Sequence, residues 1–144
     1  METRVRHVSE VPVSTGLPKA VANPIKPERF AGKHEAALGK AVGLTQFGVN
    51  LVTLEPGSMT SLRHWHEAED EFVYVLEGEV VLVDDNGDHT MPAGSFAGFP
   101  ANCENAHHLQ NRSQERATMI VVGARRRGED VVHYPDDALG PNRR

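Results

Sequence analysis

The sequence predicts an all-β domain, either a sandwich or a barrel, and three observations lead to this prediction. Short β-rich segments follow one another from about residue 46 onward, and strands at such regular spacing are typical of sandwiches and barrels. Strong turn signals separate them, among them Pro56-Gly57 and Asn86-Gly87, and Asn-Gly readily supplies the positive φ that hairpin turns require. Strands do not alternate with long helical segments, so a parallel α/β sheet is not expected.

Length and composition limit the class of protein. A chain of 144 residues is most simply one domain that buries its apolar side chains in a single core. The formal net charge of -5 argues against a nucleic-acid partner, because such proteins carry a basic face. The chain begins without an apolar signal-peptide core and contains no stretch long enough to span a bilayer. Its single cysteine, Cys103, requires no oxidising compartment. We therefore expect a cytoplasmic protein without a membrane partner.

Residues 1–45 form an N-terminal arm in this interpretation. Prolines at positions 12, 18, 24 and 27 punctuate short apolar pieces and favour extended or turning backbone. A short helix over residues 27–38 is one alternative, which Gly32 and Gly39 weaken. An arm laid along the domain or along a partner subunit is the other, and the sequence leaves both open.

The barrel core is expected over residues 46–123, and residues 124–144 are expected to form a C-terminal extension. Each strand is bounded by turn residues: Glu77-Gly78 connects one pair, and the segment 84–87 connects the next. A loop is expected over residues 100–105. The predicted strands are 48–55, 71–76, 79–83, 88–91, 95–99, 106–110 and 116–122.

A group of histidines and a glutamate predicts a metal site. His64 and His66 are two residues apart, so in a strand they point to the same face, roughly 6.5 to 7 Å apart. Glu71 opens the next strand after an acidic turn, and this return would bring its carboxylate beside the imidazoles. His107 lies on a later strand and could supply a fourth ligand from across the barrel. Three imidazoles and one carboxylate suit a divalent ion such as Zn, Fe(II), Mn, Ni or Cu, with positions left open for water or substrate.

Two stretches of the chain resemble the paired motifs of the cupin superfamily. The first motif is a glycine, His-x-His, a glutamate and a closing glycine; the second is a glycine, Pro-x-Gly, a histidine and an asparagine. The first run is one residue longer here than in the common form, and the loop over residues 100–105 is inserted into the second. His107, rather than His108, keeps the three-residue gap before the asparagine. The matching residues are Gly57, His64, His66, Glu71 and Gly78, then Gly87, Pro92, Gly94, His107 and Asn111.

The resemblance implies a double-stranded β-helix, which is a jelly-roll barrel, commonly a homodimer. It also implies a divalent metal at His64, His66, Glu71 and His107. We expect a metal-dependent enzyme that acts on a small polar substrate, of the dioxygenase, isomerase, lyase or decarboxylase type, sugar-phosphate isomerases included. The alternatives are a non-catalytic module that binds or senses a small molecule such as a sugar, and a structural metal-stabilised dimer. Fold does not decide between them, and the sequence assigns no catalytic residue.

Several nearby side chains have simpler, structural explanations. Strand alternation turns His108 away from its neighbour, so packing or solvent contact is expected there. Asn111 is expected to fix a turn or a supporting hydrogen bond. Phe96 and Phe99 could rim the cavity, although ordinary core is favoured for both. Cys103 is interpreted as an incidental thiol near the site, because reactivity requires a depressed pKa.

Two further expectations concern charge. The basic run over residues 125–127 could clamp a phosphate, but such runs are usually solvated faces. Glu71 is the one acidic side chain expected to point inward, with Val73 and Val75 lining an apolar cavity beside it. The zinc-protease helix motif is excluded, because His66-Glu67 is followed by no second histidine at the required spacing.

Overall fold

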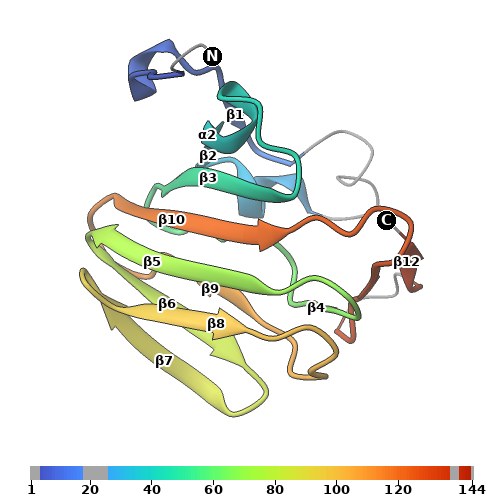
Figure 1. The fold of residues 1–144 in the computed structure, drawn as a ribbon. Helices are drawn as coiled ribbons and strands as arrows, with labels where there is room; N and C mark the ends of the chain where they lie inside the picture. Colours follow the sequence, from blue (N-terminus) through green and yellow to red (C-terminus); the bar gives the residue numbers. More distant parts are fainter. Residues whose placement is uncertain (1–3, 18–25, 137–139, 144) are drawn as a thin grey trace.

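The computed structural model describes residues 4–17, 26–136 and 140–143, and within them a large antiparallel sheet faces two smaller ones (Figure 1). The order of the large sheet is β1-β2-β3-β10-β5-β8. Its strands are β1 (Val13–Thr15), β2 (Lys33–Ala37), β3 (Phe47–Leu54), β10 (Ala117–Ala124), β5 (Glu71–Glu77) and β8 (Phe96–Phe99).

The smaller sheets complete the barrel. One has the order β7-β6-β9 and the other the order β12-β11-β4. Their strands are β7 (Gly87–Pro92), β6 (Glu79–Asp84), β9 (His108–Gln110), β12 (Asn142–Arg143), β11 (Val131–His133) and β4 (Trp65–His66). The expected all-β jelly-roll fold is confirmed, and the described helices are the 3-10 helices η1 (Val8–Glu10) and η2 (Pro27–Phe30) and the short α2 (Leu38–Ala41). None of these is long and apolar enough to cross a membrane.

The N-terminal arm lies along the domain and extends the large sheet. The β2 strand pairs with β3 over five residues, and β1 pairs with β2. A helix over residues 27–38 is therefore wrong: η2 ends at Phe30, and the amide of Glu55 donates to the carbonyl of Gly32. Pairing with an available sheet edge satisfies the backbone groups that a helix would have satisfied. Residues 18–25, which include two of the prolines, lie outside the described residues.

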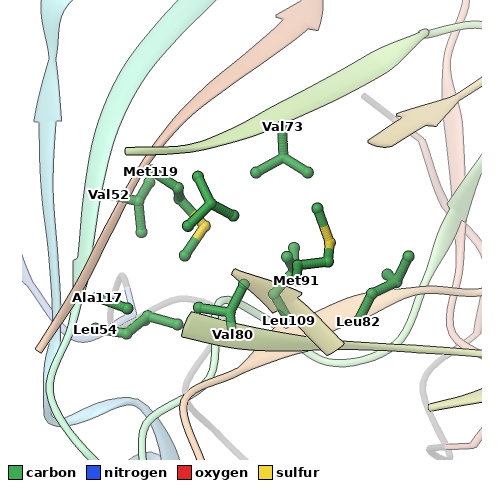
Figure 2. Close-up of a cluster of buried hydrophobic side chains, with 10 residues drawn as sticks. Val52, Leu54, Val73, Val80, Leu82, Met91, Leu109, Ala117 and Met119 are labelled. Atoms are coloured by element: carbon green, nitrogen blue, oxygen red, sulfur yellow. The ribbon is translucent and has the colours of Figure 1, made fainter. Parts of the chain in front are cut away.

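The hydrophobic core lies between the large sheet and the β7-β6-β9 sheet. Alternation on β5 points Val73 and Val75 inward, where they are 1% and 0% exposed, while Phe72, Tyr74 and Leu76 remain on the outer face. Figure 2 shows the inward side chains meeting from both layers. The cluster consists of Val52, Leu54, Val73, Val75, Val80, Leu82, Met91, Leu109, Ala117 and Met119.

The outer face of the large sheet carries exposed aromatic and aliphatic side chains. Phe96 on β8 is 68% exposed and its ring stacks on that of Phe72, with centroids 5.9 Å apart. Core packing, which the sequence favoured for Phe96, is wrong, because alternation on β8 turns this side chain outward. Exposed apolar patches of this kind often mark interfaces, so this face is the surface that the expected homodimer would bury. The homodimer stays a prediction.

Gly78 closes the turn between β5 and β6 in a conformation that other residues rarely adopt. Its φ is +75°, and a Cβ built on it would lie 2.6 Å from the carbonyl oxygen of Arg116 on the neighbouring backbone. Gly94 has a φ of +91° but nothing within 4 Å of a built Cβ. The two glycines share the conformational requirement and differ in the space around them.

We expect Gly78→Ala to destabilise the protein more than Gly94→Ala. Both substitutions place a side chain in the left-handed region at about 1–2 kcal/mol, and Gly78→Ala adds a backbone clash of about 1–3 kcal/mol. Urea unfolding of the two variants measures the difference in free energy of unfolding. Equal losses in the two variants would show that the clash at Gly78 is relieved without cost.

Candidate metal centre

The backbone brings His64 and His107 side by side. Each donates its amide N–H to the other's carbonyl, at 3.1 and 3.0 Å, and the two ring centroids lie 4.8 Å apart. His66, two residues further along, places its ring centroid 5.0 Å from that of His64. The expected common face of His64 and His66 is thus observed, although β4 is regular over only two residues.

Glu71, at the start of β5, points at all three imidazoles. Its Oε1 atom lies 3.4 Å from Nε2 of His64, 3.1 Å from Nε2 of His66 and 3.0 Å from Nε2 of His107. The structure therefore brings together all four residues that the sequence singled out. Their role as metal ligands stays a prediction.

The opposite ring nitrogens are held by hydrogen-bond acceptors. Nδ1 of His64 donates to the carbonyl of Leu62 at 2.8 Å, and Nδ1 of His66 donates to Oδ2 of Asp130 at 2.7 Å. Nδ1 of His107 faces the carbonyl of Asn105 at 3.5 Å. Because carbonyls and carboxylates only accept, these contacts place a hydrogen on Nδ1 and turn Nε2 toward Glu71, where it either carries a second proton that the carboxylate accepts or offers its lone pair to a metal.

This donor set fits a metal ion. Three Nε2 atoms lie within 3.4 Å of one carboxylate oxygen, a cluster that is unfavourable unless protons or a metal ion bind between the groups. Ligand atoms bound at about 2.1 Å lie about 3.0 Å apart at a right angle and about 3.4 Å apart at the tetrahedral angle. The observed separations of 3.0, 3.1 and 3.4 Å span this range. The ligand atoms of His64, His66 and Glu71 all lie within 4.8 Å of one another, whereas His107 is outside this group and reaches it through its contact with Glu71 at 3.0 Å.

The electrostatics of the group also favour a cation. Burial on its own would raise the pKa of Glu71, but hydrogen bonds with the three imidazoles outweigh it and hold this pKa well below its ordinary value. Burial would likewise lower the pKa of His66, yet the Glu71 and Asp130 carboxylates outweigh it and raise this pKa. A buried carboxylate that stays ionised beside imidazoles attracts either protons or a metal to the same point.

Asp130 and Glu69 are the supporting carboxylates that sequence reasoning missed. Asp130 is fully buried; Oδ2 accepts from His66, and Oδ1 accepts from the amide of Ala68 at 2.9 Å. Glu69 is 9% exposed, accepts from the amide of Arg126 at 2.9 Å and lies 3.8 Å from Nδ1 of His66. Glu71 is therefore not the only inward acid. The sequence offered only a general clue to such carboxylates: a metal-binding imidazole usually donates its other N–H to a hydrogen-bond acceptor.

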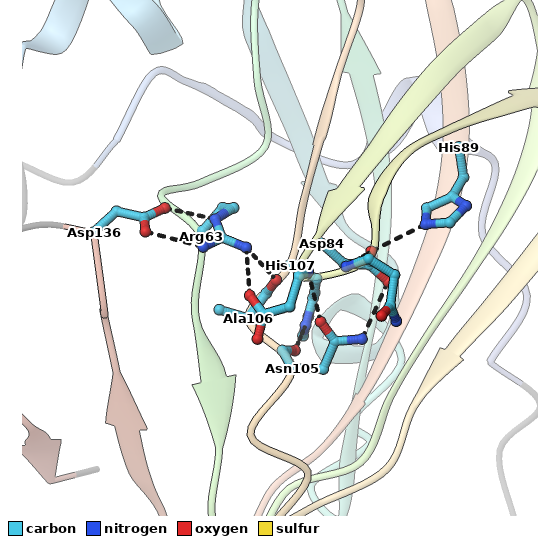
Figure 3. Close-up of polar contacts among 9 residues, drawn as sticks. Arg63, Asp84, His89, Asn105, Ala106, His107 and Asp136 are labelled. Carbon is cyan, nitrogen blue, oxygen red and sulfur yellow. Dashed lines mark hydrogen bonds and ion pairs between the residues drawn. The ribbon is translucent and has the colours of Figure 1, made fainter.

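Arg63 ties the two histidine-bearing segments to the C-terminal part of the chain (Figure 3). Its guanidinium donates to the carbonyl of Ala106 at 3.0 Å and to Asp136 through two nitrogens, and it pairs with Asp85 at 2.8 Å. The carboxylates of Asp136 and Asp85 raise the pKa of Arg63, and Arg63 in turn lowers the pKa of Asp136. Because His64 follows Arg63 and His107 follows Ala106, this bonding fixes the backbone that carries both imidazoles.

A pocket of about 600 Å³ opens over the group. Polar side chains of Asn50, Thr60 and Ser61 and apolar side chains of Val73 and Val121 line it. Basic and acidic side chains from other parts of the chain also reach it: Lys33, Glu35, Glu69, Arg125 and Arg127. A concave site with a few convergent polar groups in an apolar wall is typical of small-molecule binding.

Four other residues that the sequence singled out lie close to the site or support it. His108 is buried, donates from Nδ1 to the carbonyl of Ser61 at 2.8 Å and has its pKa lowered by burial. Asn111 is 1% exposed and donates to the carbonyls of Leu54 and Glu115, which fits the expected turn role. Phe99 packs against the core cluster, as favoured, and also lines the pocket, where it stacks on His107 with ring centroids 3.7 Å apart. Cys103 is exposed and lines a smaller cavity behind the site.

Comparison with known proteins places the chain among proteins of similar fold. The family model described as "Cupin domain" matches residues 50–123. A crystal structure described as a sugar phosphate isomerase from the cupin superfamily, from Silicibacter pomeroyi, is 40% identical, with a TM-score of 0.81 over 96% of this chain and 90% of that chain. A structure from Acidithiobacillus ferrooxidans, provisionally described as a sugar phosphate isomerase, is 32% identical, with a TM-score of 0.71 over 83% of this chain and 80% of that one.

A curated relative matches a shorter stretch. "Polyketide synthase CurC" from Streptomyces cyaneus is 34% identical over 79 residues, which are 55% of this chain and 49% of that protein. The match thus spans about half the length of this relative. The more extensive similarity is to the two crystal structures.

We expect Asp130→Asn to weaken metal binding while the fold is kept. The asparagine amide lacks the negative charge by which Asp130 orients the His66 imidazole and makes it more basic. Loss of such a partner typically lowers metal affinity about 10- to 100-fold. Calorimetric titration with Zn²⁺ measures the affinity, and circular dichroism checks the fold. Glu129→Gln is the matched control, because Glu129 is exposed and pairs with Arg126. Equal Zn²⁺ affinity in both variants would contradict the role of Asp130.

We expect bound metal to be lost as the pH falls. Ligation requires the Nε2 lone pairs, and protons compete for them near the ordinary imidazole pKa of about 6.5. The raised pKa of His66 moves this competition upward in pH. Equilibrium dialysis and elemental analysis should show a full site at about pH 7.5 and progressive loss below about pH 6. Retention of the ion at about pH 4 would argue against imidazole ligation.

Proposed function

Because this chain belongs to the cupin family, we propose that it is a metal-dependent enzyme that isomerises a small sugar phosphate. His64, His66, Glu71 and His107 hold the metal in this proposal. The observation that carries it is the convergence of three imidazole nitrogens on one carboxylate oxygen, at 3.0 to 3.4 Å, beside a pocket of about 600 Å³. A small substrate can reach the ligand atoms through this pocket.

The choice of reaction rests on the extent of similarity. The structure described as a sugar phosphate isomerase matches nearly the whole of this chain at 40% identity, whereas the polyketide synthase relative matches about half. The isomerase similarity therefore extends beyond the barrel core to the arm, whose Lys33 and Glu35 line the pocket. A cupin fold alone would leave the reaction open.

The reaction can be divided between the metal and the side chains of the pocket. When bound, a divalent ion supplies Lewis-acid polarisation of a substrate carbonyl. Asn50, Thr60 and Ser61 offer hydrogen bonds to sugar hydroxyls, and Val73, Val121 and Phe99 exclude water around the reacting carbons. Isomerisation also requires a group that removes a proton from one carbon and returns one to its neighbour.

Glu69 is the candidate for this proton transfer. It is buried, lines the pocket and belongs to the segment between His66 and Glu71. One carboxylate oxygen is held by the amide of Arg126 at 2.9 Å. This bond fixes Oε2, while Oε1 lies 3.8 Å from Nδ1 of His66, so in this proposal Glu69 exchanges a proton with the substrate from a position beside His66.

We expect metal-loaded protein to interconvert aldose and ketose forms of a phosphorylated sugar, with Glu69→Gln slowing turnover. Proton-transfer groups contribute about 10²- to 10⁴-fold, and glutamine keeps an oxygen for the amide of Arg126. Proton NMR of a panel of aldopentose and aldohexose phosphates follows the reaction, and elemental analysis checks the metal. Glu67→Gln is the control, because Glu67 is exposed and contacts His133.

The outcomes separate the candidate classes. A reduced kcat in Glu69→Gln with full metal content supports the proton-transfer role, and equal kcat in both variants refutes it. Tight binding of a sugar phosphate without turnover would place the protein among the binding or sensing modules. Absence of both binding and turnover would leave the structural, metal-stabilised alternative.

A further inference from the structure

Two arginines that line the pocket form no ion pair with any residue that the structure describes. Arg125 and Arg127 are exposed and line the pocket. Within residues 4–17, 26–136 and 140–143, no carboxylate lies within ion-pair distance of either guanidinium, whereas Arg63, Arg112, Arg116 and Arg126 each have one. Two unpaired guanidinium groups at a pocket provide a site for an anion.

A row of residues without side chains connects these arginines to the metal centre. Across the large sheet, Glu71 pairs with Gly123, and Gly123 pairs with Gly48. The guanidinium of Arg125 covers Gly48, where a built Cβ would lie 2.9 Å from its Nη2 atom. Because strands lie about 4.8 Å apart, Gly48 is about 10 Å from the strand of Glu71. The two glycines leave the floor of the pocket open between Glu71 and Arg125.

We propose that Arg125, seated on Gly48 and assisted by Arg127, is the subsite for the phosphoryl group of the substrate, an inference that rests on the proposed isomerase function. The carbonyl end of the substrate lies at the metal centre, and the phosphoryl end lies about 10 Å away, two strand spacings across the sheet. This span suits a short sugar chain. The glycine row allows the chain to lie flat between its two ends.

The charges along the pocket support this orientation. Glu69 and Glu71 lie at the metal end and offset the charge of a divalent ion there, whereas the arginine end carries two positive charges with no ion-pair partner among the described residues, which attract a dianion. Lys33, also in the pocket, is engaged by Glu35 at 3.3 Å. Each guanidinium group can bind a phosphate through two parallel N–H donors. A pair of guanidinium groups therefore matches the charge of a phosphoryl dianion better than that of a singly charged carboxylate ligand.

Arg126 provides a matched control within the same run. Its guanidinium pairs with Glu129 at 2.9 Å and does not line the pocket. Replacing it removes the same charge from the same segment without touching the subsite. A difference between Arg125→Ala and Arg126→Ala therefore reports position rather than net charge.

The first test measures the binding of inorganic phosphate at low ionic strength. ³¹P NMR monitors this binding to Zn²⁺-loaded protein and to metal-free protein. We expect Arg125→Ala to weaken binding about 10- to 100-fold, as for loss of a charged hydrogen bond, and Arg126→Ala to leave it unchanged. Gly48→Ala should also weaken binding, because its methyl group displaces the Arg125 guanidinium. This second variant meets only the end of a flexible side chain, so the fold is kept.

Three results would overturn the subsite. The first is equal phosphate affinity in wild type and Arg125→Ala, and the second is equal weakening by Arg125→Ala and Arg126→Ala. The third is phosphate binding that is seen only when Zn²⁺ is present, which would place the phosphate on the metal. Acetate is the comparison anion, and acetate binding as tight as phosphate binding would overturn the phosphoryl assignment. Weaker acetate binding supports it.

Kinetics separate this inference from the isomerase proposal. Phosphate binding that depends on Arg125, in a protein without isomerase turnover, would keep the subsite and reject the reaction. Isomerase turnover with an unchanged KM in Arg125→Ala would keep the reaction and reject the subsite. A raised KM in Arg125→Ala with full metal content supports both.

Discussion

The structure depends on holding three imidazoles against one glutamate carboxylate inside a β-barrel. Three imidazole nitrogens lie within 3.4 Å of one glutamate oxygen, an arrangement that repels itself unless a positive charge lies in the middle. The protein holds the three rings in this orientation, because the Nδ1 atom of each ring faces a hydrogen-bond acceptor. The paired backbones of His64 and His107 and the bonds of Arg63 hold this scaffold. Rigid support of this kind is what a metal centre requires.

The large sheet divides its inner face between stability and binding. Toward one end, Val52, Met119 and Val75 occupy one row across three strands and form solid core. Toward the other end, the corresponding row is Gly48, Gly123 and Glu71, and the pocket occupies the space that side chains leave. The same strands thus carry the core and the floor of the pocket, and the change from valine and methionine to glycine marks the boundary between them.

Local patterns predicted the strands and the four central residues, because alternation and turn chemistry act over a few residues. His64 and His66 could be placed on one face from their spacing, and Glu71 beside them from the return of the next strand. His107 was a possible fourth ligand on a later strand, and the motif resemblance supported that choice. Asp130 could not be found in this way: it follows His66 by 64 residues in a run of charged residues, and only strand pairing between β4 and β11 brings them together. Phe96 was misplaced because an aromatic residue in a strand fits either face, and the sequence does not say which face of β8 is covered.

Completion of the centre by Asp130 bears on how this protein folds during translation. His66 leaves the ribosome 64 residues before the carboxylate that orients it. A nascent chain that ends just after the second motif, at Asn111, lacks both β10, which lies between β3 and β5 in the large sheet, and the acceptor behind one imidazole. Because a domain generally folds as a unit, the four residues gain all of their supporting acceptors only once β11 has paired with β4. If the centre binds a metal as we propose, the supported geometry is available to the ion only in the nearly complete chain.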